Sequence, residues 1–210
     1  MSLPESITSA ILSDALDAEG IRGQVLDGLT PLHPGLRVVG RAATVQFAPT
    51  EVVPDDPYRQ MIEFIDGLEA GALAVVATNR SRRSAFWGEL FSAAAIGRGA
   101  VGLVSDGCLR DTPGIVRQGF PAFAPGARPI DFQGRMRVVA VGDPVTCGGV
   151  RISPGDLVLA DDDGVVAVPH DVEAVVVGRA KDRASRESTV LDELREGATL
   201  NEVWERHRIL

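Results

Sequence analysis

Between residues 72 and 124, short apolar runs alternate with longer helical stretches, and this order constrains the fold more than any other feature. Three runs are continuously apolar, as in strands covered on both faces: ALAVVAT (72–78), VGLVSDG (101–107) and FPAFA (120–124). Two expected helices separate them: GELFSAAAIGRG (88–99) and RDTPGIVRQGF (110–120). Strand, helix, strand, helix, strand is the pattern of right-handed βαβ units. The sequence therefore predicts an α/β fold around a parallel sheet.

The flanking segments fit one domain with that core. Upstream, the pattern predicts a helix ending near Gly20, a strand over 37–47 and a helix over 58–71. Residues 135–169 are β-rich with turn residues at each junction, including Asp163-Gly164, and predict an antiparallel β layer. A helical stripe follows: Val172, Val176, Ala180, Ala184, Leu191 and Leu194. We predict a single domain over 1–210 whose C-terminal helical arm spans about 170–210.

Composition excludes several classes of protein. With 45% hydrophobic and 24% charged residues, the 210-residue chain can bury a core. No apolar run approaches the roughly 20 residues that a membrane span needs, and the acidic start lacks the build of a signal peptide. A formal net charge of −8 argues against electrostatic binding to nucleic acid or to an anionic membrane. Two cysteines fit a reducing compartment, so we predict a cytoplasmic protein.

Two loops stand where parallel sheets bind ligands, at the carboxyl ends of strands. Residues 106–111 (DGCLRD) follow one buried strand and end in Arg110 and Asp111, which by themselves are also explained as a salt bridge and a helix cap. Residues 88–91 (GELF) follow another strand and open a helix whose free amides suit a carboxylate ligand. If these strands are neighbours, the two loops form one anion-binding site.

Other motifs have structural interpretations. The G-x-G-x-x-G match at 97–102 follows a helix and precedes a strand, so it predicts a helix end and a turn instead of a dinucleotide site. We interpret Asp14, Asp106 and the DDDG run at 161–164 as structural, the last as a hairpin turn. Phe86 and Trp87 are explained equally well by a pocket wall and by core packing.

In order and spacing, four segments resemble the 4-hydroxy-4-methyl-2-oxoglutarate aldolase and RraA-like family: SDALD (13–17), WGELFSAAAIGRGAVGLVSDGCLRD (87–111), GFPAFAPG (119–126) and GDLVLADDDGVVAVP (155–169). The resemblance implies an α/β/β/α swivelling sandwich that assembles as homotrimers or homohexamers with active sites between subunits. It also implies a class II pyruvate aldolase. Other members regulate a ribonuclease by protein contact and lack the metal-binding aspartate, so a non-catalytic regulator is the alternative.

The resemblance assigns roles to individual residues. Asp111 is implied to hold Mg²⁺, or Mn²⁺ or Co²⁺, largely through ordered waters. Arg110 is implied to bind the 2-oxo acid and to stabilise the enolate oxygen, while the loop amides receive the pyruvyl carboxylate; this substrate site comprises Gly88, Glu89, Leu90, Phe91 and Arg110. Glu89 is implied to act through a metal-bound water, and Glu187 is our candidate for a catalytic glutamate from a neighbouring subunit.

Elementary chemistry agrees with a metal-dependent route. Retro-aldol cleavage to a pyruvate enolate needs a lysine Schiff base or a divalent Lewis acid. Lys181 is the only lysine, and it lies off the apolar stripe of a charged helix, so we expect it in solvent. Glu187 lies on that stripe, where a carboxylate needs a partner, and an intersubunit salt bridge with an arginine explains it as well as catalysis does.

We therefore expect cleavage of a 4-hydroxy-2-oxo acid to pyruvate, with oxaloacetate decarboxylation through the same enolate. A substrate with a second carboxylate needs a second cation. The arginines just before the GELF loop are candidates for it, although surface solvation explains them too: Arg80, Arg82 and Arg83.

Overall fold

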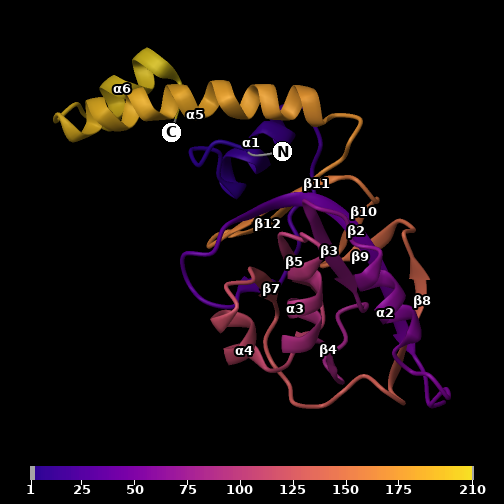
Figure 1. The fold of residues 1–210 in the computed structure, drawn as a ribbon. Coiled ribbons are helices and arrows are strands. Elements are labelled where there is room, and N and C mark those ends of the chain that lie inside the picture. Colours follow the sequence, from indigo (N-terminus) through magenta and orange to yellow (C-terminus); the bar gives the residue numbers. More distant parts are fainter. Residues whose placement is uncertain (1–2, 210) are drawn as a thin grey trace.

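The computed structural model describes residues 3–209 and has the predicted parallel sheet at its centre (Figure 1). Strands β3 (Ala72–Ala77), β5 (Gly102–Ser105) and β7 (Ala122–Ala124) pair in parallel, and each of their residues is buried. Helices α3 (Glu89–Gly97) and α4 (Thr112–Arg117) lie between them in the chain. Burial on both faces explains why these strands are apolar at consecutive positions.

The long strand β2 (Val38–Pro49) joins the parallel and antiparallel parts of the sheet. One edge pairs in parallel with β3. The other edge pairs antiparallel with β11 (Leu157–Asp161) in its first half and with β8 (Met136–Val141) in its second half. Strand β12 (Gly164–Val168) closes a hairpin with β11, which confirms a hairpin turn at 161–164, but Gly164 pairs with Asp161, so the turn residues are Asp162 and Asp163 instead of Asp163 and Gly164.

Most of the predicted antiparallel strands thus extend the parallel sheet. The strand order is β1-β7-β5-β3-β2-β11-β12, with β8 beside β2 and the short β1 (Thr30–Pro31) antiparallel to β7. Of the strands after residue 135, β9 (Val145–Cys147) and β10 (Val150–Ile152) alone form a separate hairpin sheet.

The packing of the β11–β12 hairpin produces the expected α/β/β/α layers. One face of the hairpin shares a core cluster with β3, through Val158, Ala160, Val165 and Ala167. Its other face packs against α1 (Ser9–Ala18) and α5 (Glu173–Arg195), through Leu157, Leu159, Val166 and Val168. Helices α2 (Arg59–Asp66) and α3 cover the far side of the parallel strands.

The C-terminal segment consists of α5 and α6 (Leu200–His207) and projects beyond the sheet (Figure 1). The apolar stripe is buried from Val176 to Ala184, but the prediction for Leu191 is wrong, because this residue is 46% exposed. Beyond the sheet, α5 packs against α6 instead, and this contact buries the adjacent Val190 with Val203. Within residues 3–209 no helix combines the length and the apolar character that crossing a bilayer requires.

The structure confirms that the G-x-G-x-x-G segment forms a helix end and a turn. It spans the end of α3 and the start of β5, and Gly99 has a φ of +82° in the turn that follows the helix. A side chain there would also meet Ala70 at 3.1 Å. The glycine therefore supplies a left-handed conformation and a close approach to the neighbouring loop.

Asp106 is a buried structural carboxylate, as predicted. It is 3% exposed at the carboxyl end of β5. Its Oδ1 accepts hydrogen bonds from the amide and hydroxyl of Thr78, and its Oδ2 accepts from the amides of Arg80 and Gly148. This one side chain therefore joins the ends of β3 and β5 to the β9–β10 turn.

We expect Asp106→Asn to lower the free energy of unfolding by about 2–4 kcal/mol, because either amide rotamer points an NH₂ group at two donors and leaves them unsatisfied. Denaturant unfolding measures the change. The matched control is Asp163→Asn at an exposed turn position, expected to stay within about 0.5 kcal/mol of the wild type. Equal stability of the two variants would contradict the role given to Asp106.

Candidate active site

Two short strands continue from the carboxyl ends of β3 and β5 and bring the predicted loops together. Strands β4 (Ala85–Trp87) and β6 (Cys108–Leu109) pair in parallel, and α3 and α4 begin just after them. The amide of Arg110 donates to the carbonyl of Trp87 at 2.9 Å, which ties one loop to the other. The two loops are therefore neighbours, as the anion-site hypothesis requires.

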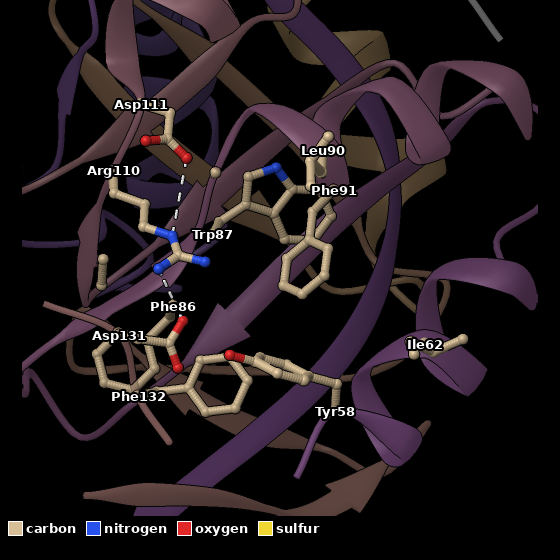
Figure 2. Close-up of a pocket in the computed structure, with 12 residues that line it drawn as sticks. Tyr58, Ile62, Phe86, Trp87, Leu90, Phe91, Arg110, Asp111, Asp131 and Phe132 are labelled. Carbon is tan, nitrogen blue, oxygen red and sulfur yellow. Dashed lines mark ion pairs between the residues drawn. The ribbon is translucent and has the colours of Figure 1, made fainter. Parts of the chain in front are cut away.

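A cavity of about 390 Å³ lies where these loops meet (Figure 2). Its walls come from β4, the first turn of α3, the loop after β6, the start of α2 and the loop before β8. The lining residues are Tyr58, Ile62, Ala85, Phe86, Trp87, Gly88, Leu90, Phe91, Arg110, Asp111, Asp131 and Phe132. Five of the predicted site residues are among them: Gly88, Leu90, Phe91, Arg110 and Asp111.

The position of Asp111 before a helix suggested an ordinary helix cap, but its side chain does not cap the helix. It precedes α4 with a φ of +53° in the left-handed region, and its side chain makes no capping hydrogen bond. The carboxylate is 54% exposed and lies on the cavity wall, with Oδ2 3.7 Å from Nε of Arg110. A non-glycine residue in this conformation costs free energy, which is typical of positions constrained by function.

Gly88 leaves the space that the Asp111 carboxylate occupies. A Cβ atom at Gly88 would lie 2.8 Å from Oδ2 of Asp111 and 3.1 Å from Cγ of Arg110. The backbone of Gly88 is extended, with a φ of −155°, so the lack of a side chain matters here for proximity and not for backbone conformation. The glycine of the GELF loop thus lets the two charged side chains approach the start of α3.

Arg110 lies between two carboxylates (Figure 2). Besides the contact with Asp111, its Nη1 is 2.9 Å from Oδ2 of Asp131, a side chain that is 21% exposed. Both carboxylates attract the guanidinium and keep it at the cavity wall, Asp131 at close range and Asp111 through a longer electrostatic contact. Sequence reasoning missed Asp131, because it lies in an irregular loop before β8 and belongs to no motif.

Tyr58 is the second residue that sequence reasoning missed. It precedes α2, lines the cavity, and packs edge-on against Phe132 with ring centroids 5.4 Å apart. Burial raises the pKa of its phenol above the ordinary value of 10.0, and the carboxylate of Asp131 raises it further, while Arg110 opposes the change. The neutral phenol is therefore the favoured form beside this ion pair.

Aromatic side chains form the floor of the cavity. Phe86 and Trp87 are buried in the core and also line the cavity, so they serve both as core packing and as a pocket wall. The indole Nε1 of Trp87 donates to Oγ of Ser92 at 2.9 Å, and that hydroxyl donates to the carbonyl of Gly88. These bonds fix the first turn of α3 at the cavity wall, and the leading amides of a helix have no partner within it.

The other two predicted carboxylates, Glu89 and Glu187, are not among the residues that line the cavity. Glu89 is the first residue of α3 but is absent from the cavity lining, and its carboxylate is 3.4 Å from Nη2 of Arg117. Glu187 is on α5, at the other end of the molecule from β4 (Figure 1), and its Oε1 is 2.7 Å from Nε of Arg183. The arginine partner of Glu187 is thus in its own chain, and a contribution to a neighbouring subunit's site stays a prediction.

The other candidate cations are also away from the cavity lining. Lys181 is exposed on α5, as expected. Arg80 pairs with Asp27 at 3.3 Å, and Arg82 donates to the carbonyl of Pro125 at 2.8 Å. Arg110 is the one Lys, Arg or His side chain among the described residues that line the cavity.

The donor set suits a hard divalent cation that keeps most of its waters. Within residues 3–209, no group of three or more His, Cys, Asp and Glu side chains is arranged to hold a metal alone. Asp111 offers one half-exposed carboxylate to the cavity, free of any capping bond. Mg²⁺ is commonly bound through one or two carboxylates plus waters and substrate oxygens, so the residues fit that ion.

Comparisons with known proteins show which family the chain resembles. The profile of the RraA-like family, described as Aldolase/RraA, matches residues 9–167. A Halalkalibacterium halodurans protein, provisionally named 4-hydroxy-4-methyl-2-oxoglutarate aldolase, is 30% identical over 89% of this chain and 86% of its own. Protein DlpA of Legionella pneumophila is 30% identical over 94% of this chain, which spans only 32% of that longer protein.

A solved structure with the same fold supports the comparison. Streptomyces coelicolor RraAS2, described as an unusual member of the RNase ES inhibitor RraA protein family, has a TM-score of 0.79 and 31% identity. The match covers 90% of this chain and 96% of that one.

The site geometry can be tested without any assay of activity, because Tyr58 is the only tyrosine in the chain. Ultraviolet titration of the phenolate should give a pKa above 10.0 in the wild type. Asp131→Asn should lower it by removing the adjacent negative charge, whereas Asp66→Asn, on the exposed end of α2, should leave it unchanged. The stability that Tyr58 contributes is present below pH 10.0 and is lost as pH rises through the raised pKa of the folded state.

An unshifted wild-type pKa, or the same pKa in both variants, would show that Tyr58 does not lie beside Asp131 in solution.

Proposed function

The chain belongs to the RraA-like family described as Aldolase/RraA, and on that basis we propose that it is a divalent-metal-dependent aldolase. Its substrate is a 4-hydroxy-2-oxo acid, which it cleaves to pyruvate and a second carbonyl compound. The observation that carries the proposal is the meeting of Arg110, Asp111 and the first turn of α3 in one cavity. The first turn of α3 suits the carboxylate of a pyruvate enolate, and Arg110 suits the oxyanion that develops on C2. Asp111 suits the Lewis acid that stabilises this oxyanion.

The chain's own groups bind and orient the pyruvyl half of the substrate. The amides at the start of α3 receive its carboxylate, because they lack intrahelical partners and stand at the positive end of the helix dipole. The Arg110 guanidinium, held by Asp131 at 2.9 Å, donates to the oxygen on C2. Asp111 would hold Mg²⁺, or Mn²⁺ or Co²⁺, and the bound ion would supply Lewis-acid polarisation of the 2-oxo group.

Cleavage then follows from charge stabilisation at the oxygen on C2. The C4 hydroxyl loses its proton, the C3–C4 bond breaks, and its electron pair forms the C2–C3 double bond of the enolate. The fixed N–H donors of Arg110 stabilise the negative charge as it develops on the C2 oxygen. We assign the removal of the hydroxyl proton to Glu89, acting through a water, because Glu89 begins α3 directly after Gly88 of the cavity wall. Protonation at C3 completes pyruvate.

Oxaloacetate decarboxylation passes through the same enolate, so we propose it as an accompanying activity. In that reaction the bond that breaks joins C3 to the C4 carboxyl carbon, and carbon dioxide leaves in place of a carbonyl product. The same contacts from Arg110 and the start of α3 serve both reactions.

The alternative is a non-catalytic regulator that binds a ribonuclease or another protein, in keeping with the description of the Streptomyces relative. The retention of both Arg110 and Asp111 on the wall of a cavity favours the enzyme. A regulator that acts through its surface has no need of a left-handed aspartate beside a glycine that makes room for it.

We expect Asp111→Asn to reduce Mg²⁺-dependent release of pyruvate from oxaloacetate by about 100-fold or more, because the substitution removes the anionic oxygen ligand. Coupling to lactate dehydrogenase measures the pyruvate, with the rate of Mg²⁺ alone subtracted. Asp17→Asn, an exposed carboxylate on α1, is the control and should keep the wild-type rate. An Asp111→Asn variant as active as this control would refute the assignment of the metal ligand.

Arg110→Lys should lower kcat by about 10²–10³-fold, because an ammonium group cannot make the two directed contacts of a guanidinium with the 2-oxo acid. The same coupled assay gives kcat and KM separately. The control is Arg98→Lys, an exposed arginine at the opposite end of α3. If the two variants turned over alike, the role of Arg110 at the enolate would be wrong.

A further inference from the structure

Tyr58 brings a phenol hydroxyl to the cavity wall, beside the ion pair of Arg110 and Asp131. Its hydroxyl points to the Asp131 carboxylate, which is itself 2.9 Å from Nη1 of Arg110 (Figure 2). Both charged groups act on the phenol: Asp131 favours its neutral form and Arg110 opposes this. The steps assigned to Arg110, Asp111 and Glu89 do not use this hydroxyl.

The ring of Tyr58 is held in place by the aromatic floor of the cavity. It packs edge-on against Phe132, with ring centroids 5.4 Å apart. Phe132 packs in the same way against Phe47 of β2 at 5.1 Å, and these two phenylalanines are 2% and 1% exposed. The hydroxyl is therefore attached to a ring that rests on the buried core, which gives it a defined position at the cavity wall.

Tyr58 is also the partner of Asp131 that has a proton to give. Burial raises the pKa of the phenol above the ordinary value of 10.0, and the adjacent carboxylate raises it further. A neutral phenol can donate its proton, whereas an ionised carboxylate can only accept one. The ion pair therefore has a protonated oxygen acid beside it at neutral pH.

The binding mode proposed for the pyruvyl half brings C3 of the enolate close to this hydroxyl. The C1 carboxylate lies at the start of α3 and the C2 oxygen lies at Arg110. Because C2 is trigonal, C3 leaves it in the third direction of the same plane, one bond away from the carbon whose oxygen Arg110 binds. Arg110, Asp131 and Tyr58 line the cavity from one chain, so their arrangement does not depend on what a neighbouring subunit adds.

We propose that Tyr58 is the catalytic acid that protonates C3 of the pyruvate enolate. The O–H bond of the phenol breaks and its proton moves to C3, where the electron pair of the C2–C3 double bond forms the new C–H bond. The C2 oxygen becomes a carbonyl oxygen again, and the phenolate takes a proton back from water. In aldol cleavage, this proton balances the one that left the C4 hydroxyl. The inference rests on the proposed aldolase function.

Two reactions of the full chain with Mg²⁺ separate this step from carbon–carbon cleavage. Exchange of the methyl protons of pyruvate with D₂O, followed by NMR, moves a proton at C3 and breaks no carbon–carbon bond. Release of carbon dioxide from oxaloacetate breaks the C3–C4 bond before any proton reaches C3. The rate with Mg²⁺ alone is subtracted in both. Tyr58→Phe should lower the exchange rate by about 100-fold, and its effect on carbon dioxide release should be at least about ten times smaller.

The matched control is Ile62→Val. Each of the two substitutions removes one non-hydrogen atom from the cavity wall at α2, but Ile62→Val removes a methyl group instead of a hydroxyl. A change in packing alone affects both reactions together. Ile62→Val should therefore lower proton exchange and carbon dioxide release by the same factor.

Binding of oxalate gives a readout without turnover, because oxalate has an oxygen where the enolate has C3. The Tyr58 hydroxyl can donate a hydrogen bond to that oxygen. Calorimetry with Mg²⁺ present should show that Tyr58→Phe weakens oxalate binding by about three- to ten-fold, the usual effect of losing one hydrogen bond.

The outcomes separate this inference from the function beneath it. The role of Tyr58 is overturned, and the aldolase chemistry stands, if Tyr58→Phe keeps the wild-type exchange rate or lowers both reactions by the same factor. It is overturned as well if Tyr58→Phe binds oxalate like the wild type, or if the wild type releases carbon dioxide but exchanges no protons. If the wild type gives neither reaction, the proposed function fails and the inference fails with it.

Discussion

The candidate site depends on one set of ion pairs, in which the Arg110 guanidinium lies between Asp111 and Asp131. These contacts connect the loop after β6 to the loop before β8, and the bond from the Arg110 amide to Trp87 connects both to the start of α3. The contacts are possible only because β4 pairs with β6 and because Gly88 has no side chain. The arginine is therefore preorganised, so little reorientation is needed when charge develops on a substrate oxygen.

Much of the fold could be predicted because the relevant signals are local. Continuous apolar runs identify β3, β5 and β7, and their order in the chain predicts parallel pairing and neighbouring loops. The arrangement of the antiparallel strands was harder to predict, because β2 pairs with β8 and β11 at positions fixed by long-range packing. Leu191 shows the same limit: its periodicity is helical, but burial there depends on α6.

The candidate site divides in a similar way. Arg110, Asp111 and the GELF loop stand directly after predicted strands, so topology alone brings them together. Asp131 and Tyr58 come from segments without a motif, and only the folded chain shows that they complete the environment of Arg110. The backbone of Asp111 was also unpredictable, since an aspartate before a helix ordinarily caps it, and here the left-handed conformation presents its carboxylate to the cavity.

The central claim is that Asp131 positions Arg110 for the enolate oxygen, and binding of oxalate tests it most directly. Oxalate is a planar dianion that resembles the enolate of pyruvate, and calorimetry with Mg²⁺ present gives its Kd for the wild type and for Asp131→Asn. If Asp131 positions Arg110, Asp131→Asn should weaken oxalate binding by about ten-fold. If net charge alone governed the site, removing a negative side chain would strengthen the binding of an anion. Equal or tighter binding by Asp131→Asn would therefore contradict the account.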